Sequence, residues 1–471
     1  MSSTETLTYD TQIEMYDWRY SAAIVGLIKY FKYCYPNDET KYKIEWNDGT
    51  EVFSYNQEDI SNEKYIDFVE YVYRDELHHV ILENGLKKEE YSEEQIKFIN
   101  EKLAANVIMK KIFNKIKFDG TNTNEIKELI DKNRAILILE TFKNKKNLYA
   151  NFCNTNQMFS EEQNYARILG YTVDGGKKSK SVSYNFDTST FVGRDMREFD
   201  FIIFGFTIGR EAIFINDNWS IEGLVETNRR LQRKMEAAII DEKRGTKDTR
   251  RALFEGIIES ADFLNYDVEI IVKNIEDKFF HTMFLRKGSI NVLKQINNYN
   301  VFCTSIKVTD DYYINVQKEV TDAIINLTYL DSILDFLMKE NNKTSGKYQY
   351  LVEKLIGIDI SIGNVMRQTK NSKIKLKGGT DMKQSLEATR KSAKEVVVHL
   401  NDKENKLSAY RTKLTSALVF KDYHRFCDIL LQLSNYTDKQ FNFAFDLYDD
   451  FEGNIDVART FVNALYKEQL K

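Results

Sequence analysis

Only one of the 471 residues in this chain is a proline. Proline interrupts helices because it lacks the backbone N–H and its ring clashes with the preceding turn. The one proline, Pro36, lies near the amino terminus, so long helices can run through the rest of the chain. Hydrophobic residues make up 42% of the chain and aromatic residues 13%, enough for a large core, which excludes general disorder.

The first two thirds of the chain mix helical and strand patterns. Residues 41–56 predict a β-hairpin, because the turn Asp48-Gly49 supplies the positive φ angles that a tight hairpin needs. Segments rich in aromatic and β-branched residues, with glycines between them, predict further strands. We expect strands at residues 181–186, 199–206, 211–217, 268–272 and 280–285, and helices at 13–33, across 60–140 and at 220–240.

From residue 311 onward the pattern is helical, and we expect no strand there. Apolar residues between Val320 and Leu337 recur every three or four positions and predict one helical stripe. Further helices are predicted at residues 346–366, 381–420, 421–435 and 454–470. At about 150 residues per domain the length allows about three units, and the pattern favours two large ones. We therefore predict an α+β fold, with a mixed domain over residues 1–310 and an all-helical bundle over residues 311–471.

The charge balance is close to neutral but unevenly distributed. The chain has 67 Lys and Arg against 72 Asp and Glu, a net charge of −5. Residues 51–101 carry fourteen acidic and five basic residues, a face that would repel phosphates. Residues 229–251 carry nine basic and four acidic residues, and residues 341–420 have a net charge of +9. Separate basic stretches are typical of proteins that bind a nucleic-acid backbone, although a solvated helix face has the same composition.

The cysteines and the apolar runs give no sign of a zinc site, secretion or a membrane. The four cysteines lie far apart and form no CxxC pair, which argues against a local zinc site and a disulfide framework. The amino terminus lacks a signal-peptide pattern, and the apolar run of residues 21–28 is shorter than the roughly 20 residues that a bilayer requires. We expect a cytoplasmic protein without a cofactor or metal.

No motif makes a strong argument for catalysis. Residues 170–179 approach a phosphate-binding loop, but a glycine separates the second loop glycine from the lysine. Asp75, His79 and Glu83 have helical spacing and could share one face as metal ligands, although ordinary solvated surface is the expected reading. The acidic residues 446–452 lack the calcium-loop pattern. We predict that the chain is not an enzyme, with a metal-dependent nuclease using either acidic set as the alternative.

Three groups of segments, near both ends and in the middle, occur in a characteristic order. Residues 16–27 place aromatic residues before small ones in the first predicted helix, and residues 213–224 form the central group. The carboxy-terminal group comprises residues 410–411, 420–426, 430–434 and 445–452. Together they resemble the large subunit of a type I-B CRISPR Cascade effector complex over essentially the whole chain. Some members of that family carry paired CxxC zinc ligands, which this chain lacks, so the resemblance implies no metal here.

The resemblance implies a binding role within a crRNA-guided complex. Such a subunit contacts the crRNA, recognises the PAM in double-stranded target DNA and stabilises the R-loop. Its implied partners are the Cascade backbone and small subunits, and a helicase-nuclease recruited after target binding. The carboxy-terminal part resembles the small subunit, and Met338 and Met366 are candidate internal starts. A purely structural interaction protein is a further alternative.

Candidate binding residues follow from the chemistry of each implied contact. Glycines allow close backbone approach, lysines meet phosphates and amides can read base edges. The candidates for PAM or DNA binding are Gly175, Gly176, Lys177, Lys178, Lys180, Asn216 and Asn218. The candidates for binding a strand or heteroduplex backbone are Arg367, Lys370, Lys373, Lys375, Lys377, Arg390, Lys391 and Lys394. The candidates for binding RNA or a partner subunit are Arg229, Arg230, Arg233 and Lys234.

Overall fold

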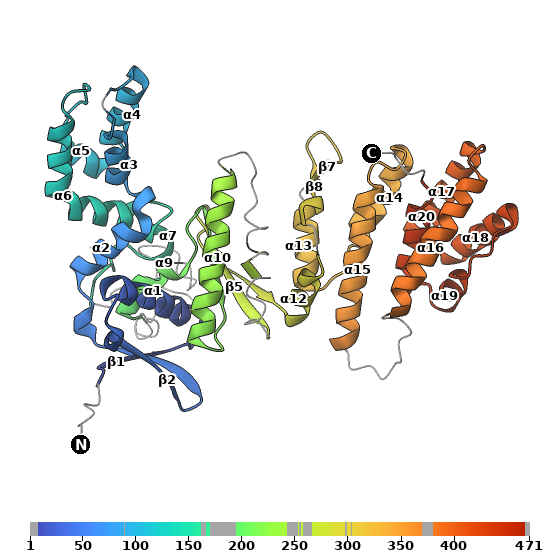
Figure 1. Cartoon of the computed structure of the whole chain (residues 1–471), viewed down its shortest axis with the longest axis horizontal. Coiled ribbons are helices and arrows are strands. Elements are labelled where there is room, and N and C mark those ends of the chain that lie inside the picture. The colour runs from blue at the N-terminus through green and yellow to red at the C-terminus, as the bar shows by residue number, and fades with distance from the viewer. Residues whose placement is uncertain are drawn as a thin grey trace, which may run out of the picture. The chain divides into compact units, whose positions relative to one another are not determined.

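The computed structural model confirms the predicted α+β class and divides the chain into two compact units (Figure 1). The units are Met1–Phe284 and Leu285–Lys471, whereas the sequence pattern placed the boundary at residue 310. The structure describes residues 8–88, 90–161, 166–169, 195–242, 253, 256–257, 266–296, 299–302, 304–369 and 380–466. No helix within these described ranges is long and apolar enough to span a bilayer.

A small antiparallel sheet opens the first unit and packs on its first helix. The sheet has the order β1-β3-β2, with β1 at Thr11–Glu14, β2 at Tyr42–Asn47 and β3 at Thr50–Tyr55. The predicted hairpin is confirmed, because Asn47 pairs with Thr50 and the turn residues Asp48 and Gly49 have φ angles of 45° and 91°. Helix α1 (Trp18–Cys34) is buried along most of its length and ends before Pro36.

The helical pattern predicted across residues 60–140 is confirmed. Helices α3, α4, α5 and part of α6 surround a separate apolar core that includes Leu82, Phe113 and Leu137 (Figure 1). The helices are α2 (Asn62–Tyr73), α3 (His78–Gly85), α4 (Glu93–Leu103), α5 (Val107–Phe113), α6 (Thr123–Asn144) and α7 (Tyr149–Phe152).

The strand predicted at residues 199–206 is wrong, because this segment is helical. It forms a 3-10 helix, η5 (Arg197–Phe201), followed by α9 (Ile202–Gly205). Two glycines allow the backbones of α1 and this segment to approach each other closely. A Cβ atom on Gly26 would lie 2.2 Å from the carbonyl oxygen of Phe201, and a Cβ atom on Gly205 would lie 2.7 Å from the carbonyl oxygen of Ala22. Apart from Asp200, which pairs with Arg167, residues 199–206 are apolar or glycine because they are buried between neighbouring elements, so their residue types do not reveal the backbone conformation.

A second sheet has the order β4-β5-β6 and confirms three predicted strands. Its strands are β4 (Glu211–Asn216), β5 (Val268–Asn274) and β6 (His281–Leu285). The predicted helix after Ser220 is α10 (Ile221–Glu242), and the Ser220 hydroxyl accepts a hydrogen bond from the Gly223 amide at 3.0 Å. The strand predicted at residues 181–186 lies outside the described residues.

The second unit is mainly helical but contains a short hairpin. Its strands are β7 (Ser305–Lys307) and β8 (Tyr313–Asn315), so the prediction of no strand after residue 311 is wrong by one three-residue strand. The stripe from Val320 to Leu337 is divided between two helices, because Leu327 adopts a φ of 50° and ends the first of them. The helices are α12 (Lys287–Lys294), α13 (Val316–Asn326) and α14 (Asp331–Lys343).

Six further helices, of which α19 is the shortest, complete the described part of the second unit. The single helix predicted at residues 381–420 is two helices, which a turn at residues 400–403 separates. The sequence pattern also missed the short helix α19. The helices are α15 (Gln349–Thr369), α16 (Thr380–His399), α17 (Glu404–Val419), α18 (Tyr423–Thr437), α19 (Ala444–Asp449) and α20 (Ile455–Asn463).

Candidate nucleic-acid interface

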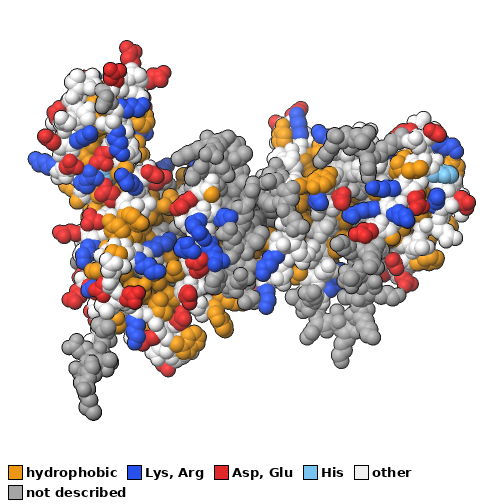
Figure 2. All heavy atoms as spheres, in the orientation of Figure 1, with side chains coloured by type: hydrophobic (Ala, Val, Ile, Leu, Met, Phe, Trp, Pro, Cys, Tyr) orange, Lys and Arg blue, Asp and Glu red, His pale blue; other side chains and the backbone are white. Residues whose placement is uncertain are grey.

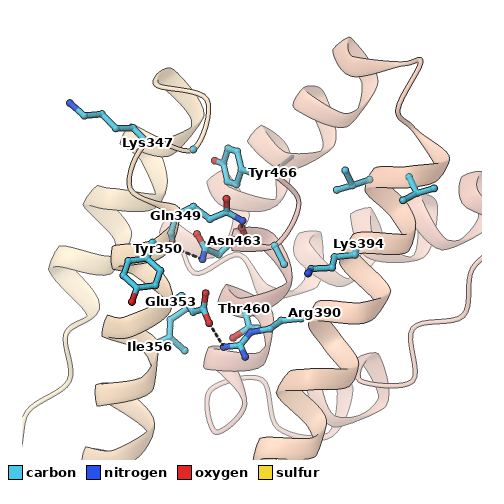
Figure 3. A pocket seen from close by; sticks show the side chains of 14 residues that line it. Lys347, Gln349, Tyr350, Glu353, Ile356, Arg390, Lys394, Thr460, Asn463 and Tyr466 are labelled. Carbon is cyan, nitrogen blue, oxygen red and sulfur yellow. Dashed lines mark hydrogen bonds and ion pairs between the residues drawn. The ribbon is translucent and has the colours of Figure 1, made fainter. Parts of the chain in front are cut away.

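A groove in the second unit contains two of the predicted cationic residues. Helices α15, α16 and α20 form its walls, and its volume is about 810 Å³ (Figure 3). Arg390 and Lys394 line it from α16. On the face of the molecule shown in Figure 2, basic side chains are interspersed with acidic ones, so positive charge is concentrated only locally.

The helical periodicity of α16 places both cations on one wall of the groove. The helix buries Leu386, Ala393 and Val396 against the bundle. Arg390 and Lys394 are four residues apart and therefore lie one above the other on the helix surface. Figure 3 shows the Lys394 side chain extending from α16 toward the space between the helices.

The Arg390 guanidinium is held by an ion pair that an anionic ligand can replace. Its Nη2 atom lies 3.3 Å from Glu353 Oε1 on α15, and the two side chains are 37% and 41% exposed. Such exposed ion pairs contribute only about 0–1 kcal/mol. A phosphate in the groove can therefore take the place of the Glu353 carboxylate at a low cost in stability.

One rim of the groove carries an aromatic side chain in contact with solvent. Tyr350 on α15 is 49% exposed, and Lys354 Nζ lies 5.0 Å from the centroid of its ring. An exposed ring beside cations can stack a nucleobase. Tyr466 has a structural role instead, because it is buried against the Arg411 guanidinium and its hydroxyl donates to Asn342 Oδ1 at 3.0 Å.

The floor of the groove is polar and comes from α20. Asn463 Nδ2 donates to the Gln349 carbonyl oxygen at 2.9 Å, and Gln349 Nε2 donates to the Asn463 carbonyl oxygen at 3.0 Å. Thr460 lies one helical turn before Asn463 and beside Arg390 (Figure 3). The groove thus combines two cations, the Glu353 carboxylate, an aromatic rim and hydrogen-bonding groups. Cations beside an exposed ring are typical of proteins that bind single-stranded nucleic acid.

The other residues predicted to bind a strand backbone do not line this groove. Lys391 is exposed on α16 outside the groove, and Arg367 on α15 donates from Nη2 to Asn364 Oδ1 at 2.8 Å. The remaining four candidates, Lys370, Lys373, Lys375 and Lys377, lie outside the described residues.

The two amide candidates in the first unit differ sharply in exposure. Asn216 ends β4, is buried, and donates from Nδ2 to Glu269 Oε2 at 3.0 Å. Asn218 is exposed, and so is the neighbouring Trp219. The structure therefore leaves Asn218 accessible to a ligand, whereas Asn216 stabilises the pairing of β4 with β5. The candidates Gly175, Gly176, Lys177, Lys178 and Lys180 lie outside the described residues.

On α10, a glutamate partly neutralises the basic cluster. Arg229 Nε and Arg230 Nε each donate to the Glu226 carboxylate at 2.7 Å, and these hydrogen bonds lower the pKa of Glu226 to about 2. Arg233 is exposed, and Lys234 is half-buried. Glu226 therefore offsets part of the positive charge of Arg229 and Arg230, and the surface of this helix is less basic than its number of Lys and Arg residues indicates.

The acidic sets considered as metal sites have other surroundings. Asp75 lies in the 3-10 helix η3 (Arg74–Glu76), and α3 begins only at His78, so the predicted shared helical face is wrong. His79 is fully buried rather than solvated, its Nε2 lies 2.8 Å from Glu70 Oε1, and burial lowers its pKa. Glu83 accepts a hydrogen bond from Arg134.

The carboxy-terminal acidic set lies on the surface. Asp446, Asp449, Asp450 and Glu452 are all exposed at or just after α19. Across the part of the chain that the structure describes, no cluster of three or more His, Cys, Asp or Glu side chains is placed to hold a metal ion.

Comparison with protein families gives a match over most of the chain. A family model described as CRISPR-associated protein Csx8 matches residues 9–465, which covers nearly all of both units. Searches of curated proteins and of solved structures find no match.

Proposed function

The chain belongs to the Csx8 family of CRISPR-associated proteins, and on this basis we propose that it is the large subunit of a crRNA-guided, type I-B Cascade complex. In this role it recognises the PAM in duplex DNA, and guide pairing then reads the rest of the target. Its partners are the crRNA, the Cascade backbone and small subunits, and a helicase-nuclease that binds after target recognition. The proposed role is binding rather than catalysis.

The observation that supports a nucleic-acid role most directly is the groove between α15, α16 and α20. Arg390 and Lys394 line it together, and Tyr350 offers an exposed ring at its rim. Cations that contact phosphates supply affinity without sequence choice, and exposed rings stack unpaired bases. We propose that this groove holds the DNA strand that guide pairing displaces.

Recognition of the PAM belongs, in this proposal, to the first unit. Asn218 is the exposed amide candidate there, and an asparagine amide can pair with an adenine edge in the major groove. Asn218→Ala should lower the preference of the complex for its PAM, whereas Asn216→Ala should act by destabilising the second sheet.

Charge reversal at the groove tests the strand-binding proposal. The double variant Arg390→Glu/Lys394→Glu should weaken binding of single-stranded DNA and reduce its salt dependence. For each phosphate that the variant no longer neutralises, the slope of log affinity against log salt should become shallower by about 0.7. Fluorescence anisotropy over a range of salt concentrations measures both effects.

Lys391→Glu is the matched control, because Lys391 lies on the same helix, is exposed and does not line the groove. It should retain most of the affinity. Equal decreases in affinity for the control and the double variant, or unchanged binding in both, would contradict the assignment of the groove.

A further inference from the structure

The floor of the groove contains two buried polar atoms without a hydrogen-bond partner in the described structure. They are Thr460 Oγ1 and Asn463 Oδ1. Their residues are only 4% and 6% exposed, yet both line the groove. Buried polar atoms are rarely left unpaired, because each costs about 1–3 kcal/mol of desolvation. These two atoms lie one helical turn apart on α20 and both of their residues line the groove, so a ligand that enters this part of the groove can supply the missing partners.

The hydrogen bonds already made by Asn463 settle which of its amide atoms is free. Its Nδ2 group donates to the Gln349 carbonyl oxygen at 2.9 Å, and a carbonyl oxygen can only accept. Oδ1 is therefore the unpaired atom, and it requires a donor from the ligand. The adjacent Thr460 hydroxyl can either donate or accept.

We propose that this floor is a nucleobase subsite, in which one unpaired base of a single strand bonds Thr460 and Asn463 while a neighbouring phosphate meets Arg390 or Lys394. The inference rests on the proposed strand-binding function and extends it from the backbone to the base. The ligand of this subsite is a single strand, because a base in a duplex already forms hydrogen bonds to its partner base through its pairing edge.

The chemistry of the subsite suits a base without selecting one. Every base pairing edge presents an N–H donor beside an acceptor, which matches an amide oxygen beside a hydroxyl. Figure 3 shows Thr460 next to Arg390 and Asn463 next to Gln349, so hydrogen-bonding groups and the cationic wall lie within one groove. The subsite should therefore distinguish a strand with bases from one without them.

The experiment compares two fluorescent strands of equal charge bound to the full-length protein. One is a mixed-sequence DNA of about 20 nucleotides, and the other has the same phosphates but abasic residues. The wild type should bind the base-bearing strand several-fold more tightly. Thr460→Val replaces the unpaired hydroxyl by a methyl group and should reduce this preference to the part that stacking on Tyr350 supplies, with affinity for the abasic strand unchanged. Thr460→Ser should retain the preference.

Controls separate a local effect from a change in folding. Thr460→Val should not lower the midpoint of thermal unfolding, since the hydroxyl has no partner to lose. Ser54 Oγ in the first unit is also buried without a partner, and Ser54→Ala should leave both affinities unchanged. If the Thr460→Val variant does not fold, Thr460→Ala gives the same test, because alanine also lacks the hydroxyl and has a smaller side chain.

The outcomes distinguish the two proposals. If the wild type binds neither strand, or if Arg390→Glu/Lys394→Glu changes neither affinity, the strand-binding function itself is wrong. If the wild type binds both strands equally, or if Thr460→Val retains the full preference, only the base subsite is wrong and backbone binding stands.

Discussion

At the scale of single residues, two glycines allow a close backbone approach that any larger residue would force apart. Gly26 on α1 faces the Phe201 carbonyl, and Gly205 on α9 faces Ala22. The neighbouring atoms are backbone, which cannot move aside as a flexible side chain can. These glycines therefore set the distance between the two elements at the centre of the first unit.

The first prediction is that Gly26→Ala destabilises the protein. An added methyl group must push α1 away from η5, and overpacking of this kind costs about 1–3 kcal/mol. Urea denaturation monitored by circular dichroism measures the decrease in stability. Gly357→Ala on α15 is the matched control, because a Cβ there meets nothing within 4 Å.

Gly357→Ala should instead stabilise the protein by about 0.5–1 kcal/mol, since alanine is the better helix former. Equal effects from the two substitutions would contradict the role assigned to Gly26.

At the scale of elements, a buried arginine joins helices α14, α15 and α20. Arg459 on α20 lies 2.7 Å from Asp331 Oδ1 and 3.4 Å from Asp359 Oδ2. Asp359 Oδ1 also accepts a hydrogen bond from the Leu330 amide at 2.7 Å, just before α14. Burial, together with the nearby Asp456 carboxylate, raises the pKa of Asp359 to about 7.

This arrangement predicts a specific pH dependence of stability. Because the folded state holds the Asp359 proton more tightly than the unfolded chain, this residue's contribution to stability is lost as the pH rises from about 4 to about 7. Asp359→Asn keeps the oxygen that accepts from Leu330 but cannot titrate. Relative to the wild type, the variant should become progressively more stable as the pH rises from about 4 to about 7, by at most about 1.4 kcal/mol per pH unit.

Thermal unfolding at several pH values checks this prediction. Asp449→Asn, on the exposed part of α19, is the control and should follow the wild type. A constant difference between Asp359→Asn and the wild type at every pH would show that Asp359 does not change its protonation in this range.

Features with a local sequence signal were predictable, and features that depend on packing between distant segments were not. The hairpin turn at Asp48-Gly49 was predicted because its signal lies in two adjacent residues. The helical state of residues 202–205 was missed because it depends on close packing against α1, far away in the sequence. Arg390 and Lys394, which line the groove, were among the candidates that charge predicted. Thr460 and Asn463 were missed because an unpaired buried atom leaves no local sequence signal.

At the scale of the whole molecule, the near-neutral net charge conceals unlike surfaces. The acidic segment of residues 51–101 contains the helices α2 and α3 and most of β3 and α4 in the first unit. The basic excess of residues 341–420 contributes Lys347, Arg390 and Lys394 to the groove of the second unit. The match to the Csx8 family spans both units. In the proposed function the first unit recognises the PAM, and the groove of the second unit holds the displaced strand.

The most direct test of the central claim measures how tightly a crRNA-loaded complex binds target duplexes that differ only in the PAM. The complex is assembled once with this chain and once without it. We predict PAM-dependent binding only when the chain is present. Equal affinity for both duplexes in its presence, or the same PAM preference in its absence, would contradict the proposal that this protein recognises the PAM.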